Sequence, residues 1–225
     1  RFNLITGNSP GNDMRFYVEK CEAMRNFCNK IWNASRFVMM NLSIDKNELP
    51  EKLEIEDKWI LSKLNTVIKE VCENMDSYEL GVAAGKIYDF IWDSYCDWYI
   101  ELTKPRIQAG GETKETAQAV LVWVMQGMLK LLHPFMPFIT EEIWQVLTNE
   151  SGMIMLESYP VYDSSISYDD EEKAFEKIIA SIKAVRNTRT ELNVPPSVKA
   201  KLFIETADAK LFTSCSVFFE KLVSA

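Results

Sequence analysis

The chain has 225 residues, of which 47% are apolar, and it carries a formal net charge of −8. A chain of this length and composition can bury a hydrophobic core, and no apolar run approaches the roughly 20 residues that span a bilayer. We therefore expect a globular protein without a membrane segment or a signal peptide, and the acidic balance argues against tight nonspecific binding to nucleic acid.

The five cysteines are odd in number, widely spaced and contain no Cys-x-x-Cys pair. This pattern argues against a disulfide framework and against a zinc site. It favours free thiols in a reducing, cytoplasmic compartment.

The first two thirds of the chain predicts an antiparallel helix bundle over residues 1–148. Apolar residues recur at helical spacing in segments at about 10–41, 56–76, 79–107, 113–132 and 140–147. Ser9-Pro10 is a capping hydroxyl before a proline at the start of the first segment. Gly110-Gly111 ends the third segment, and His133-Pro134 ends the fourth.

The composition changes after Asn149, and we expect residues 149–225 to form a helix plus a small α/β appendage. Residues 168–192 and 207–225 have helical character, whereas the short apolar runs at 153–156 and 200–204 predict strands. The fold class is therefore mainly α, a helix bundle with a small C-terminal α/β appendage.

The segment 24–38 predicts a helix with two unlike faces. One face is a core stripe of Met24, Phe27, Ile31, Ala34, Ser35 and Val38. The other carries amides, cations and a ring, and no acid occurs from Asn26 to Leu42. Amides hydrogen-bond base edges, cations meet phosphates and a ring stacks on a base, so we expect this face to bind single-stranded nucleic acid. Its candidate residues are Asn26, Lys30, Asn33, Phe37, Arg36 and Arg25.

The position of Phe37 leaves two interpretations open. It lies about 120° around the helix from Ile31, so it either packs against another helix or stacks on an unpaired base. Lys30, Asn33 and Asn26 share its flank, whereas Arg25 and Arg36 lie toward the other side. Trp32 is expected in the core.

Charge is distributed unevenly along the chain. Residues 1–42 hold six Lys/Arg against three Asp/Glu, and residues 181–201 hold five against one, within an otherwise acidic protein. Arg186 and Arg189 lie one turn apart in the second basic segment. They are candidates for contact with an RNA backbone, or they bond helix-terminal carbonyls or pair with acids.

Three stretches carry a family resemblance. They are residues 6–13 with Asn29-Lys30-Ile31-Trp32-Asn33-Ala34-Ser35-Arg36-Phe37, the proline-rich junction at 132–144, and the segment 185–197. Together they resemble the anticodon-binding region of bacterial valyl-tRNA synthetases, which are class Ia aminoacyl-tRNA synthetases. The proline-rich junction is shared with the leucyl and isoleucyl relatives, so the Asn29–Phe37 run is the part that indicates valine.

The resemblance implies that this chain recognises a tRNA anticodon and is not itself catalytic. The family's ATP-handling signatures, His-Ile-Gly-His and Lys-Met-Ser-Lys-Ser, do not occur here. ATP and Mg²⁺ would serve the parent enzyme, in a domain before Arg1, and a coiled-coil arm would follow Ala225. The expected partners are a valine-accepting tRNA and the rest of the synthetase chain. We identify no catalytic or metal-ligating residue, and we expect the single histidine, His133, to be structural.

Two alternatives remain at this point. The chain also fits the equivalent domain of an isoleucyl or leucyl enzyme. From a different class, it fits a helical protein-interaction module that uses its acidic surface to bind a basic partner.

Overall fold

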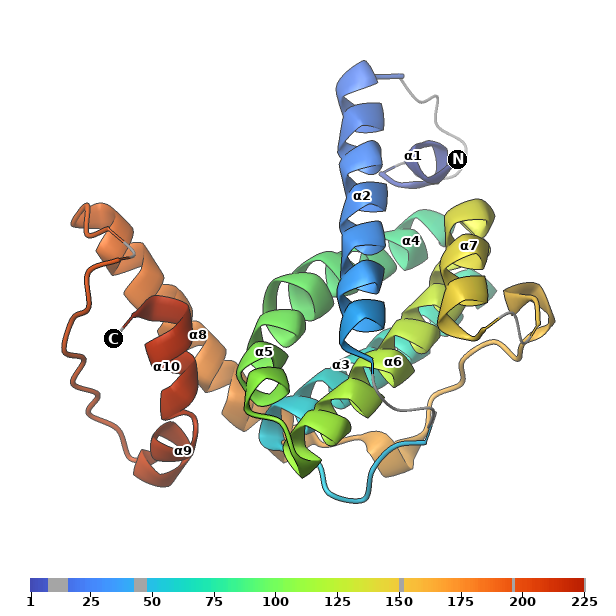
Figure 1. Cartoon of the computed structure of the whole chain (residues 1–225). Helices are drawn as coiled ribbons and strands as arrows, with labels where there is room; N and C mark the ends of the chain where they lie inside the picture. The colour runs from blue at the N-terminus through green and yellow to red at the C-terminus, as the bar shows by residue number, and fades with distance from the viewer. Residues whose placement is uncertain (8–15, 43–47, 150–151, 196, 225) are drawn as a thin grey trace. The chain divides into compact units, whose positions relative to one another are not determined.

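The computed structural model describes residues 1–7, 16–42, 48–149, 152–195 and 197–224 (Figure 1). The chain divides into two compact units, Arg1–Ser167 and Tyr168–Ala225. The beginning of the first expected helix, with its Ser9-Pro10 cap, lies outside the described residues.

The first unit is built from helices, which confirms the predicted helix bundle. In chain order these are α1 (Phe2–Ile5), α2 (Val18–Asn41), α3 (Ile55–Asp76), α4 (Leu80–Asp89), the π-helix η1 (Phe90–Tyr99), α5 (Ile100–Ala109), α6 (Glu112–Leu132) and α7 (Pro137–Leu147). Helices α4, η1 and α5 follow one another without a break, so the single helix predicted over 79–107 is present. Two features were not predicted, namely the short helix α1 and the π-helical geometry of η1.

The predicted helix ends have clear physical causes. Gly110 and Gly111 both have a φ of 77°, a conformation that L side chains rarely adopt, and they separate α5 from α6. Helix α3 begins with a capping box, in which the Asp57 carboxylate accepts a hydrogen bond from the Glu54 backbone N–H at 3.0 Å.

The core of the first unit is apolar and closely packed. Helix α3 packs against α4 and α6, α5 packs against α6, and α2 lies against η1, α6 and α7 (Figure 1). Burial of these faces is what stabilises the bundle, because isolated helices of this length are marginal in water. The largest fully buried side chains include Trp59, Tyr95, Tyr99, Phe27, Ile31 and Leu61.

The segment after α7 is fixed to the bundle by a buried amide. Asn65 on α3 donates to the Asp163 carbonyl at 2.7 Å and to the Ser167 hydroxyl at 3.0 Å, and its own oxygen accepts from the Asp163 N–H at 2.9 Å. Residues 152–167 therefore belong to the first unit, and the division falls after Ser167 rather than at the change of composition near Asn149.

The second unit contains α8 (Asp169–Glu191), α9 (Ala209–Ser214) and α10 (Ser216–Val223). Phe175 of α8 meets Phe218 of α10 edge-on, with ring centroids 5.8 Å apart. Lys177 and Asp208 form an ion pair at 2.6 Å. The predicted helices over 168–192 and 207–225 are thus present, the second as two short helices.

The two predicted strands are wrong. The first is a single 3₁₀ turn, Ile154–Leu156, and residues 200–204 have no regular secondary structure. A strand needs a neighbouring strand to pair its backbone N–H and C=O groups, and no strand occurs in the described parts of the chain. A short apolar run occurs both in strands and in loops that pack against a core. The sequence pattern alone therefore led to a wrong strand prediction for both segments.

None of the helices in the described chain is both long and apolar enough to cross a bilayer.

Candidate nucleic-acid interface

Helix α2 turns its predicted core face into the bundle. Phe27, Ile31, Ala34, Ser35 and Val38 are buried, and Met24 at the edge of this stripe is half-buried. This orientation leaves the amide-rich and cationic surface of α2 on the outside.

The exposed side of α2 has two flanks, as the helical angles predicted. Asn26 and Asn33 are exposed on the flank nearer η1, whereas Arg25 and Arg36 are exposed on the other flank. Trp32 lies with the arginines and is 40% exposed, so its expected place in the core is wrong. The reason is angular, because Trp32 lies about 120° from the centre of the buried stripe.

Lys30 is held by two side chains of η1. Its ammonium lies 3.7 Å from the centroid of the Trp92 ring and 2.6 Å from the Asp97 carboxylate. The Lys30 side chain is only 21% exposed. Because its ammonium has three donors and Asp97 takes one, Lys30 can still donate to a ligand at the surface.

Phe37 is half-buried at the border of α2 and α5. The Lys104 ammonium lies 5.9 Å from the centroid of its ring, and Lys104 also pairs with Glu101 at 2.5 Å. A ring that is partly exposed and partly packed is compatible with both interpretations given above, stacking on a base and packing between helices.

An aromatic cluster packs α2 against α4 and η1. Phe27 lies 4.6 Å from Tyr88, and Tyr88 stacks on Trp92 at 5.6 Å with an interplanar angle of 16°. Further along the same helical run, Tyr95, Trp98 and Tyr99 of η1 are buried and belong to the core. Trp92 and Tyr88 are only half-buried, so they lie at the edge of the core beside the candidate interface.

The continuous helical run formed by α4, η1 and α5 carries four acids at intervals of four residues. They are Asp89, Asp93, Asp97 and Glu101. Partial burial, followed by repulsion from Asp93, raises the pKa of Asp89 above its usual value. Asp97, which pairs with Lys30, makes this edge of the basic surface of α2 acidic and unfavourable for a phosphate. Of these acids Asp97 pairs with Lys30 at 2.6 Å, a contact that the spacing of residues in the sequence does not predict.

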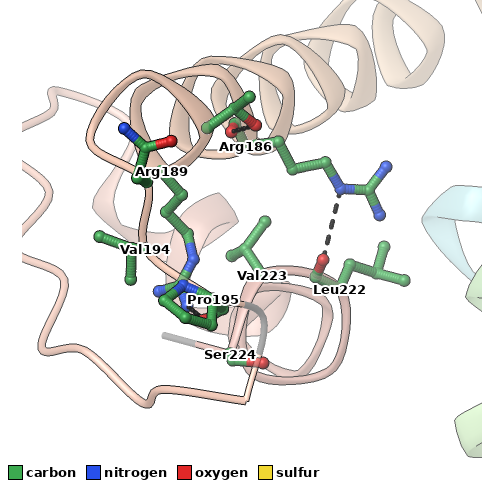
Figure 2. A pocket seen from close by; sticks show the side chains of 9 residues that line it. Arg186, Arg189, Val194, Pro195, Leu222, Val223 and Ser224 are labelled. Carbon is green, nitrogen blue, oxygen red and sulfur yellow. Dashed lines mark hydrogen bonds between the residues drawn. The ribbon is translucent and has the colours of Figure 1, made fainter.

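In the second unit, Arg186 and Arg189 border a cavity of about 540 Å³ (Figure 2). Arg186 Nε donates to the Leu222 carbonyl at 3.3 Å, in the last turn of α10. The Arg189 guanidinium donates to the carbonyls of Pro195 and Val198 at 2.9 and 2.6 Å. Of the three roles considered, the structure shows Arg186 bonding a helix-terminal carbonyl, whereas the Arg189 acceptors lie in the segment after α8.

A buried ionic cluster lies elsewhere in the first unit. The Arg106 guanidinium donates two bonds to the Asp57 carboxylate, at 2.7 and 2.9 Å, and one to Glu56 at 2.9 Å. The Tyr99 hydroxyl donates to Asp57 at 2.6 Å. Burial, together with the Asp57 charge, raises the pKa of Glu56 from 4.5 to about 7, although the nearby Arg106 acts in the opposite direction. Both carboxylates are buried and the Arg106 side chain is 12% exposed, so this cluster ties α3 to η1 and α5.

His133 has a structural contact, since its Nδ1 lies 2.7 Å from the Thr140 hydroxyl, and Thr140 donates to the Met136 carbonyl. Within the described ranges, no group of three or more His, Cys, Asp or Glu side chains is placed to hold a metal ion.

Comparison with known proteins identifies relatives along the whole chain. The family model for the anticodon-binding domain of tRNA ligase matches residues 57–204. Over its entire length the chain is 48% identical to the valine–tRNA ligase of Clostridium acetobutylicum and 51% identical to that of Clostridium tetani. These two matches include α2, which precedes the region that the family model covers.

The chain spans about a quarter of the length of these curated relatives, 26% in both cases. Among solved structures, the LeuRS of Agrobacterium radiobacter K84, in its ternary complex with tRNA and LeuAMS, superposes with a TM-score of 0.58. That match covers 74% of this chain and 20% of the other, at 18% identity, and so it supports the fold alone. The resemblance drawn from the sequence is confirmed.

Proposed function

The chain belongs to the anticodon-binding domain family of tRNA ligases, and we propose that it recognises the anticodon stem-loop of a valine-accepting tRNA. In this proposal it acts as one region of a valine–tRNA ligase, whose reaction joins valine to its tRNA with ATP. The region itself contributes differential binding, which selects the correct tRNA, and the bond-forming chemistry takes place in another part of the enzyme.

The main support for the proposal is the composition of one exposed flank of α2. Asn26, Lys30, Asn33 and Phe37 share one flank of α2, and that flank is outside the core although the helix is firmly packed. An amide, a cation and a ring on one rigid helix are the groups that single-stranded RNA recognition uses.

Each of these side chains has a proposed role. Phe37 stacks on an unpaired anticodon base, Asn26 and Asn33 bond base edges, and Lys30 donates to a base oxygen or a phosphate. Arg25 and Arg36, on the opposite flank, would meet the backbone of the flanking nucleotides. Their separation from Lys30 means that one loop reaches both flanks only if its backbone crosses the helix.

Arg186 and Arg189 are proposed as weaker backbone contacts. Both guanidinium groups already donate to carbonyls, so each would meet a phosphate through its remaining N–H groups.

ATP and Mg²⁺ are proposed to act only in the part of the enzyme that activates the amino acid. The sequence contains neither ATP-handling signature, and the described residues offer no carboxylate group arranged for a metal. We also propose that the protein is cytoplasmic, a proposal supported by its five cysteines, none of which forms a disulfide.

The test is a titration of the 225-residue chain with a stem-loop that carries a valine anticodon, beside the same stem with a scrambled loop. We expect preferential binding of the valine loop that weakens as salt rises, because phosphate contacts release counterions. Lys30→Ala should weaken this binding.

Lys69→Ala is the matched control, since Lys69 makes a similar contact with the Tyr162 ring at 5.6 Å but lies on α3. Equal affinity for both loops, or an equal loss in both variants, would refute recognition through this flank of α2.

A further inference from the structure

The π-helix η1 brings together two side chains that an α-helix would keep apart. Trp92 and Asp97 are five residues apart, and both contact the ammonium of Lys30. In an α-helix five residues turn through about 500°, which would leave these side chains about 140° apart. The wider π-helical turn, at about 80° per residue, reduces the separation to about 40°.

Lys30 is consequently fixed from two directions. Trp92 offers the face of its ring at 3.7 Å, and Asp97 accepts a hydrogen bond at 2.6 Å. Trp92 is itself stacked on Tyr88, so the platform under the ammonium is rigid. A lysine side chain is ordinarily flexible, and this arrangement removes most of that freedom.

We infer that Asp97 is a positioning residue for RNA recognition, which holds Lys30 against Trp92 so that the lysine reads a base rather than a phosphate. This inference rests on the proposed function. A free lysine would move to the nearest phosphate and bind any loop, because the phosphate contact carries no sequence information. A lysine held by Asp97 and Trp92 cannot move toward a phosphate, so it bonds only an acceptor that the RNA places next to its fixed ammonium.

The partial exposure of the pair fits this role. The side chain of Asp97 is 51% exposed and that of Lys30 is 21% exposed, so RNA can approach both. The Asp97 carboxylate also repels a negatively charged phosphate, whereas an uncharged base carbonyl can still approach and accept a hydrogen bond from Lys30. Specificity would thus arise from an attractive and a repulsive element in the same contact.

The experiment compares Asp97→Asn with Asp93→Asn in the 225-residue chain, using the valine-anticodon loop and the scrambled loop over a range of salt concentrations. Both substitutions remove one exposed carboxylate from η1, but the structure gives Asp93 no hydrogen bond or ion pair with Lys30. Asp97→Asn should strengthen binding of the scrambled loop and steepen its salt dependence by about 0.7, the slope of one added single-strand phosphate contact. The preference for the valine loop should fall about 2- to 10-fold, the fold-change of one hydrogen bond.

Asp93→Asn should strengthen binding of both loops by the same factor and leave the preference unchanged. Asp97→Glu, which keeps the carboxylate, should retain most of the preference. Melting temperatures of all variants establish that they are folded.

The outcomes separate the two proposals. A wild-type chain that does not distinguish the loops refutes the proposed function. A wild-type chain that does distinguish them, with Asp97→Asn indistinguishable from Asp93→Asn in both preference and salt slope, refutes the positioning role alone.

Discussion

Replacing Glu56 by glutamine should stabilise the protein above neutral pH. Glu56 is 4% exposed and shares the Arg106 guanidinium with Asp57, which is completely buried. Arg106 carries one positive charge, and Asp57 already compensates it through two hydrogen bonds. The second carboxylate therefore remains protonated in the folded state to a higher pH than usual.

The size of the effect follows from the pKa. Burial, with the Asp57 charge, raises the pKa of Glu56 from 4.5 to about 7 in the folded protein. Between these values the folded state binds more protons than the unfolded state, so the free energy of unfolding falls as pH rises. At about 1.4 kcal/mol per pKa unit, the loss approaches about 3 kcal/mol once the pH exceeds the folded value. Glutamine keeps the shape and the hydrogen bond from Arg106 but never ionises.

Urea unfolding of the wild type and Glu56→Gln at pH 5 and pH 8 measures this difference. The two proteins should be of similar stability at pH 5, and the variant should be more stable by up to about 3 kcal/mol at pH 8. Glu70→Gln is the control for losing a carboxylate from a partly exposed ion pair, here with Lys86, and should change stability by about 0–1 kcal/mol at both pH values. A difference that does not grow with pH, or a variant that is less stable at pH 8, would refute the protonation argument.

Three further outcomes are expected. Phe37→Ala should weaken binding of the valine-anticodon loop by about 1–3 kcal/mol in a titration if the ring stacks on a base, whereas unchanged affinity with a lower melting temperature would identify a packing residue. Asn65→Ala should cost about 1–3 kcal/mol in urea unfolding and speed amide exchange in residues 163–167, because the Asp163 backbone loses the buried Asn65 amide that bonds it; unaltered exchange would contradict the anchoring role. Gly85→Ala should stabilise α4 by up to about 1 kcal/mol, since a new Cβ meets no atom within 4 Å, whereas Gly127→Ala should lose stability because its Cβ would lie 2.9 Å from Leu64 Cδ2. Equal melting temperatures for these two glycine variants would contradict the packing argument.

The positions of the long helices and the exposed flank of α2 were predictable because they depend on local periodicity. Phe27, Ile31 and Val38 recur on one side of a helix, and that alone places Asn26 and Asn33 outside the core. Gly110 and Gly111 ended α5 through their backbone conformation. Pro134 ended α6 because it has no backbone N–H to continue the helical hydrogen bonds, whereas His133 before it keeps helical dihedral angles. The 200–204 segment was misassigned because a strand depends on a partner that no local pattern reveals.

The sequence by itself therefore determined the helical class, the basic and amide-rich surface of α2 and the resemblance to the anticodon-binding region of bacterial valyl-tRNA synthetases. Only the tertiary structure decided what holds Lys30 in place. Trp92 and Asp97 lie more than 60 positions along the chain from Lys30 and share a face only because η1 is a π-helix. Neither the contact between two distant helices nor the change in helical turn is encoded in the spacing of apolar residues, since both result from how the whole bundle packs.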